Sequence, residues 1–175
     1  MSRPSRPSHP DLATSADRIF FVTTSSWGKR PLFQTERMAS LLIETLRQGV
    51  RTRRFVIHDF VVMPDHVHIL LTVSGETTVE KAVQWIKGSF SFRARKELGY
   101  MGEIWQRGFS DVRVRDARSL QQHHTYIDEN PVKAGLALTA EEYPYGSAYL
   151  KKLKRSGAKA QDSFGNAGGT TEVMP

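Results

Sequence analysis

Strand-like and helix-like segments alternate along this chain, and their order limits the folds that it can adopt. Short runs of β-branched and aromatic residues predict strands at 18–24, 54–63, 67–73, 104–106 and 109–115. Apolar residues spaced three and four apart predict helices at 34–49, 77–98 and 116–130. With 104–115 taken as one bent strand, the order is β-α-β-β-α-β-α.

This order predicts an α+β fold. Two crossover helices would lie on one face of a mostly antiparallel, ferredoxin-like (RRM-like) sheet. The third helix is an addition to this plan, a C-terminal helix that carries Tyr126. Because the crossover helices cover only one face, we expect the other face to be free for a ligand.

A chain of 175 residues is long enough for one domain with a full core but short for two. We place this domain at residues 17–150. Residues 1–16 and the basic, then Gly- and Ala-rich segment 151–175 are expected to be mobile tails, because they contain too few apolar residues to offset the entropy of ordering. No apolar run approaches the roughly 18 residues of a membrane span, and no apolar signal region opens the chain, which predicts a cytoplasmic protein without a membrane partner.

The chain is basic, with 25 Lys and Arg against 18 Asp and Glu and a net charge of +7. Its basic residues gather within 47–54, 93–96, 113–118 and 151–155. Such clustering favours a polyanionic partner, nucleic acid ahead of an anionic membrane, although the charge could serve solubility alone. Zero cysteines exclude a thiolate zinc site and a cysteine nucleophile.

His66 and His68 are candidate metal ligands. They are two residues apart in a predicted strand, so their imidazoles point to the same face and both can reach one divalent ion, while Val67 points into the core. The spacing is also compatible with ordinary surface histidines. Imidazole, amide and phosphate oxygen ligands suit Mg²⁺, Mn²⁺ or Zn²⁺.

Tyr126 is the candidate nucleophile. On a helix it shares a face with Asn130, four residues later. A tyrosine beside a metal ion can attack a phosphodiester and form a covalent phosphotyrosine; the alternative is a tyrosine packed at a helix edge. His58, His123 and His124 form a competing set of ligands, but no spacing links them, which favours structural roles.

Three sequence blocks resemble a known family. They are Val62-Met-Pro-Asp-His-Val-His-Ile-Leu-Leu71, Ile104-Trp-Gln-Arg-Gly-Phe-Ser-Asp111 followed by Arg115-Asp116, and Tyr126-Ile-Asp-Glu-Asn-Pro-Val-Lys-Ala-Gly-Leu136. In this order they resemble the single-tyrosine HUH (IS200-like) transposases, and among these the REP-associated tyrosine transposases of bacteria. The similarity covers roughly residues 18–150.

The resemblance implies an enzyme that cuts single-stranded DNA at palindromes folded as hairpins. Tyr126 would take the 5′-phosphate and release a 3′-hydroxyl. His66, His68 and, as a polar third ligand, Asn130 would hold a divalent metal, Mg²⁺ or Mn²⁺. No nucleotide cofactor is expected, because the phosphotyrosine conserves the bond energy. The protein would act as a monomer or a homodimer, with the site in one chain or shared between two.

Hairpin DNA requires cations for its phosphates and aromatic faces for unpaired bases. The candidate contacts are Lys87, Arg93, Arg95, Trp105, Arg107, Phe109, Arg113 and Arg115. Core packing for the aromatic residues and a solvated surface for the cations are the alternatives. A further alternative for the whole chain is a non-catalytic nucleic-acid-binding module derived from a transposase.

Overall fold

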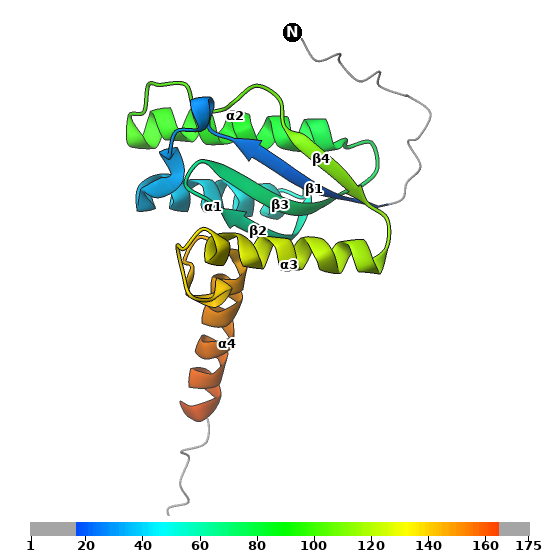
Figure 1. Ribbon diagram of the computed structural model, residues 1–175, viewed down its shortest axis with the longest axis vertical. Helices are drawn as coiled ribbons and strands as arrows, with labels where there is room; N and C mark the ends of the chain where they lie inside the picture. The colour runs from blue at the N-terminus through cyan, green and yellow to red at the C-terminus, as the bar shows by residue number, and fades with distance from the viewer. Residues whose placement is uncertain (1–16, 165–175) are drawn as a thin grey trace, which may run out of the picture.

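A four-stranded antiparallel sheet of strand order β2-β3-β1-β4 forms the centre of the computed structural model, which describes residues 17–164 and the side chains of residues 17–157 (Figure 1). The strands are β1 (Arg18–Ser25), β2 (Val56–Val62), β3 (His66–Val73) and β4 (Ser110–Val114). The helices are α1 (Glu36–Arg51), α2 (Val79–Leu98), α3 (Ala117–Lys133) and α4 (Ser147–Phe164), with 3-10 turns η2 (Trp27–Lys29), η3 (Leu32–Gln34) and η4 (Ala140–Glu142). The predicted α+β class and antiparallel sheet are confirmed.

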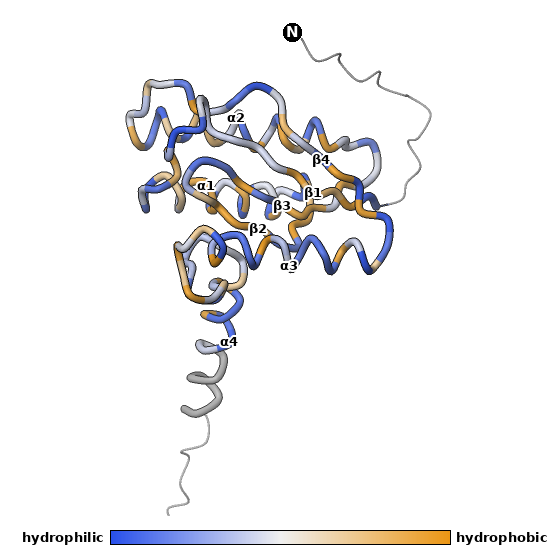
Figure 2. The backbone as a smooth tube through the Cα atoms, viewed as in Figure 1, coloured by the Kyte–Doolittle hydropathy of each residue, from blue (hydrophilic) through white to orange (hydrophobic). Residues whose placement is uncertain are grey.

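Helices α1 and α2 cover one face of the sheet and enclose the larger core. Phe90 of α2 and Leu42 of α1 are fully buried there against Val22 and Ile69 of the central strands. Figure 2 shows apolar residues concentrated in the strands between the helices. Helix α2 begins at the cap Thr78, whose side chain accepts from the amide of Lys81 at 3.2 Å. The two crossover helices thus lie as the sequence pattern predicts.

Helix α3 lies on the opposite face of the sheet (Figure 1). Its Ile127 is buried in a second core with Val61, Leu70 and Val114 from three strands. The prediction that this face is free is therefore wrong where α3 packs. The reason is that the strands carry apolar residues on both of their alternating faces, and each apolar face must be covered.

Helix α3 continues past its predicted end. It starts after the predicted cap Asp116, which accepts from the amide of Ser119 at 2.7 Å. Pro131 lies inside the last turn, and the helical pattern resumes with a 3.0 Å bond from the Ala134 amide to the Asn130 carbonyl. A proline near a helix end removes only one backbone donor, so the remaining turn survives.

Helix α4 was not predicted from the sequence. It begins before the expected domain end at residue 150 and extends away from the sheet (Figure 1). Among the described residues, Tyr126 therefore lies in the last helix but one. Residues 151–164 of the expected tail 151–175 belong to α4, whereas residues 1–16 and 165–175 lie outside the described residues. Within residues 17–164, no helix combines the length and apolarity needed to cross a bilayer.

Candidate active site

The rings of His66 and His68 converge on one point at the start of β3. They lie on the same face of the strand, as their spacing predicted, with their Nε2 atoms 3.1 Å apart. Their other nitrogens are occupied, because His66 Nδ1 lies 2.6 Å from Asp65 Oδ1 and His68 Nδ1 lies 2.7 Å from Thr23 Oγ1. Partners at Nδ1 orient both imidazoles; with the ring protons at Nδ1, both Nε2 lone pairs would be available to a cation, the usual arrangement around metal-binding histidines.

Electrostatics keep His68 neutral. The pKa of His68 is lowered to about 4, first by burial and then by the neighbouring His66, while a hydrogen bond to Asn130 acts in the opposite direction. A metal ligand must be deprotonated at the coordinating nitrogen. His68 is therefore neutral at pH 7 and can bind a metal ion without first losing a proton.

Tyr126 approaches this pair from α3. Its ring centroid lies 5.2 Å from that of His68, and 47% of the residue is exposed. Phe21 of β1 contacts both residues: its ring centroid lies 5.3 Å from that of His68 and 5.7 Å from that of Tyr126. The phenol therefore stands beside the histidine pair and remains open to a large substrate.

Asn130 lies one turn after Tyr126 on the same helix. Its side-chain amide donates to the Tyr126 carbonyl at 2.8 Å and also hydrogen-bonds with His68. Among the described residues, no group of three or more His, Cys, Asp and Glu could hold a metal ion. A divalent ion held by two imidazoles also takes oxygen ligands, and the Asn130 side chain, which hydrogen-bonds with His68, is the candidate for one of them.

Sequence reasoning missed two residues near Tyr126. Phe21 contacts both His68 and Tyr126, and alternation along β1 could have assigned it to their face. Arg118 lines, together with Tyr126, a shallow hollow of about 490 Å³ on the outer side of α3. Arg118 precedes Tyr126 by eight residues, about two helical turns, and this spacing was visible in the sequence.

The other three histidines of the described chain make structural contacts. His58 Nε2 lies 2.6 Å from Thr72 Oγ1, and His123 Nδ1 lies 2.7 Å from the Ser119 carbonyl. His124 Nδ1 lies 2.7 Å from Asp59 Oδ2. Each ring has a separate partner, so they form no common ligand set.

The candidate DNA contacts are not all near Tyr126. Arg113 pairs in register with Phe20, which packs on the α1–α2 side, so Arg113 faces away from α3. Lys87 and Trp105 lie together, since Lys87 Nζ is 5.7 Å from the Trp105 ring centroid. Arg95, Arg107 and Arg115 are exposed.

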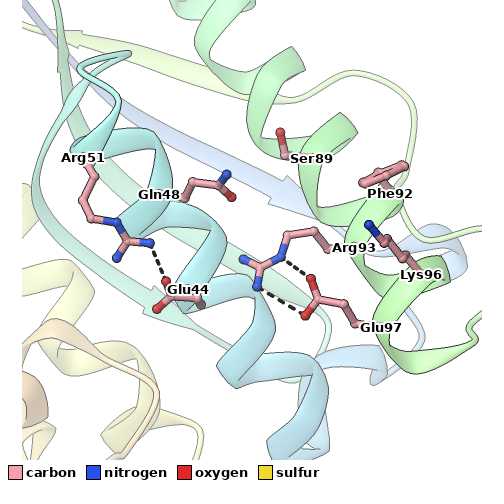
Figure 3. Close-up of a pocket in the computed structure, with 8 residues that line it drawn as sticks. All are labelled: Glu44, Gln48, Arg51, Ser89, Phe92, Arg93, Lys96 and Glu97. Carbon is pink, nitrogen blue, oxygen red and sulfur yellow. Dashed lines mark hydrogen bonds and ion pairs between the residues drawn. The ribbon is translucent and has the colours of Figure 1, made fainter.

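Arg93 lies in a hollow of about 440 Å³ between α1 and α2 (Figure 3). Its guanidinium is paired with Glu97 at 2.7 Å, and across the hollow Arg51 is paired with Glu44 at 2.6 Å. Because α1 and α2 cover the face opposite α3, this hollow is separated from Tyr126 by the sheet.

More than half of the chain matches a known protein family. Residues 19–130 match the family described as "Transposase IS200 like". The chain belongs to the IS200-like transposase family. It is 29% identical over 129 residues to the REP-associated tyrosine transposase of Escherichia coli (strain K12), covering 73% of this chain and 74% of that one. The family resemblance inferred from the three sequence blocks is confirmed.

Two further similarities agree with this assignment. The chain is 29% identical over 96 residues to a Haemophilus influenzae protein named for the same activity, and the match spans 54% of that relative and 49% of this chain. A solved REP-associated tyrosine transposase, described as bound to a REP hairpin, has the same fold, with a TM-score of 0.68 at 23% identity over 89% of this chain and 87% of that one.

Proposed function

We propose that this protein is a metal-dependent endonuclease and strand transferase for single-stranded DNA that carries a palindromic hairpin. One observation carries the proposal: the Tyr126 ring lies 5.2 Å from His68, whose Nε2 converges with that of His66. A nucleophile beside a prospective cation site is the arrangement that phosphodiester transesterification needs. Hairpin DNA as substrate is supported by the solved relative, a REP-associated tyrosine transposase bound to a REP hairpin.

In the first step the Tyr126 phenolate oxygen attacks a DNA phosphorus. A bond from the oxygen to phosphorus forms, the bond from phosphorus to the 3′-oxygen breaks, and that oxygen leaves as a 3′-hydroxyl after taking a proton. A DNA 3′-hydroxyl then attacks the phosphotyrosine, which joins the strands and returns the phenol. No bond energy is lost between the steps, so no nucleotide cofactor is required.

His66, His68 and Asn130 are the residues that would hold the ion, Mg²⁺ or Mn²⁺. When bound, it would polarise the phosphate and favour the phenolate, whose free pKa is near 10. Phe21 restrains the rings of His68 and Tyr126 by contact with both. One chain supplies all of these residues, which supports a complete site in a monomer.

Charge supports the DNA partner. Arg118 lines the hollow beside Tyr126 and is a proposed phosphate contact. Arg107 and Arg115 are exposed on the segments before and after β4 and are proposed to hold more distant phosphates. Lys87 and Trp105, which pack together, are also proposed to contact the substrate. Arg93, Arg95 and Arg113 are proposed as further DNA contacts.

Mass spectrometry tests the mechanism. Wild-type protein, Mn²⁺ and single-stranded hairpin DNA are expected to give a covalent protein–DNA adduct, and Tyr126→Phe is expected to give none. Tyr149→Phe, a partly buried tyrosine on α4, is the matched control and should form the adduct normally. Absence of an adduct from the wild type, with hairpin binding intact, would instead support a non-catalytic binding module.

A further inference from the structure

A buried carboxylate joins the tyrosine helix to the sheet. Asp59 of β2 is only 2% exposed. Its Oδ2 lies 2.7 Å from His124 Nδ1 on α3. Its Oδ1 accepts from the hydroxyl of Ser147, the first residue of α4. Burial of a carboxylate is costly unless it is fully partnered, and these partners, on two helices, lie 65 and 88 residues after Asp59 in the sequence.

A bulge in β2 is what turns Asp59 toward α3. Ile57 pairs with Leu71 and packs on the α1–α2 side, whereas Asp59 pairs with the adjacent Leu70, so the register shifts at His58. In a regular strand, residues 57 and 59 would face the same side. A bulge re-aims a side chain in this way, and bulges are frequent next to active sites.

The carboxylate contact constrains α3 in a way that its apolar contacts do not. Leu120 and Ile127 pack α3 on the sheet. Apolar packing is non-directional and roughly proportional to buried area, so it permits small shifts and rotations of a helix. A hydrogen bond of 2.7 Å has strict distance and angle requirements.

The position of His124 relates this contact to the active site. His124 precedes Tyr126 by two residues, about 200° around the helix, so the two side chains leave α3 in nearly opposite directions. His124 reaches β2, while Tyr126 reaches His68 of β3. A bond that fixes the His124 side of α3 therefore also fixes the rotation and the height of Tyr126 over the histidine pair.

We propose that Asp59 and His124 are positioning residues, which set the place of Tyr126 by tying α3 to the bulge of β2. The inference rests on the proposed function for its consequence, because the chemical step depends on where the phenol stands. Neither residue touches the substrate. Their loss should slow the chemical step and leave DNA binding intact.

Three variants test the proposal. His124→Ala removes the donor to Asp59. His124→Asn restores one, because the Asn amide nitrogen occupies nearly the position of the imidazole Nδ1. Thr45→Val is the control: the buried Thr45 hydroxyl donates to the Leu41 carbonyl at 2.8 Å, but that bond lies within α1, on the face of the sheet opposite α3.

The first readout is the single-turnover rate of adduct formation at saturating hairpin DNA with Mn²⁺. His124→Ala is expected to lower this rate by about 10- to 100-fold, the effect of misplacing a reacting group by roughly 1 Å. Its dissociation constant for hairpin DNA should match that of the wild type, and His124→Asn should recover most of the rate. The rate of Thr45→Val should equal that of the wild type, even if its unfolding temperature falls.

The second readout is amide hydrogen exchange, which needs no catalysis. In His124→Ala the amides of α3 should exchange faster, while those of α2 do not change. Unchanged exchange in α3 overturns the tether, as does a wild-type rate in His124→Ala or an equal rate loss in Thr45→Val. If the wild type forms no adduct, the proposed function is wrong, but the positioning role is not thereby refuted. Exchange in α3 then still decides whether the contact of His124 with Asp59 holds the helix.

Discussion

Thr23 and Thr24 are neighbours on β1, and changing each to valine should have different effects. Thr23→Val should weaken metal binding, whereas Thr24→Val should stabilise the fold. Thr23 Oγ1 lies 2.7 Å from His68 Nδ1. In the proposed metal site, His68 would bind the ion through Nε2, and its Nδ1–H would donate to this hydroxyl, which would hold the ring. Thr24 faces the other side of the sheet, is 2% exposed, and its hydroxyl has no hydrogen-bond partner among the described residues.

The magnitudes follow from these contacts. Loss of the partner behind a metal-binding histidine typically costs 10- to 100-fold in metal affinity, so Thr23→Val should weaken Mn²⁺ binding by about 1.4–2.7 kcal/mol. A buried hydroxyl without a partner costs about 1–3 kcal/mol, so Thr24→Val should raise the free energy of unfolding by about 1 kcal/mol and leave Mn²⁺ affinity unchanged.

Isothermal titration with Mn²⁺ measures the affinity, and urea denaturation of the metal-free variants measures the free energy of unfolding. Thr24→Val serves as the control for the loss of a β1 hydroxyl as such. The reasoning is refuted if Thr23→Val binds Mn²⁺ as tightly as the wild type, or if both variants weaken binding equally.

Three further outcomes are expected. Gly49→Ala should lower the free energy of unfolding by about 1–3 kcal/mol in urea, because the added Cβ would lie 2.2 Å from the ring of Phe55. Burial lowers the pKa of His58 below its usual 6.5, so the folded state disfavours the proton and stability falls as pH drops through 6.5; His58→Asn should flatten this dependence in denaturation measured at a series of pH values. Mixing inactive His66→Ala with inactive Tyr126→Phe should restore no adduct if, as proposed, the site lies within one chain; recovery of activity in the mixture would mean that two chains share it.

Local patterns were enough to predict much of the fold. The alternation around His66 and His68 assigned both rings to one face of a strand, and the interval of four residues placed Tyr126 and Asn130 on one face of a helix. These predictions hold because strand and helix periods are set by the backbone of each segment alone. They required no knowledge of what the segment packs against.

Other features depended on distant partners. The sequence of β2 is apolar on both faces after Asp59, so no alternation marks the bulge that turns this carboxylate toward α3. Helix α4 was missed because the basic, then Gly- and Ala-rich segment from residue 151 was interpreted as a tail; the start of the helix is held by the bond from Ser147 to Asp59. The bulge could not be predicted without the pairing of elements far apart in the chain.

By itself, the sequence indicated the candidate site residues, the strand and the helix that bear them, and the family. Only the tertiary structure decided that α3 covers the second face of the sheet and brings Tyr126 to His68. The physical reason is that side-chain direction within an element is a local property, whereas the docking of α3 depends on complementary apolar surfaces and one buried carboxylate supplied by distant strands.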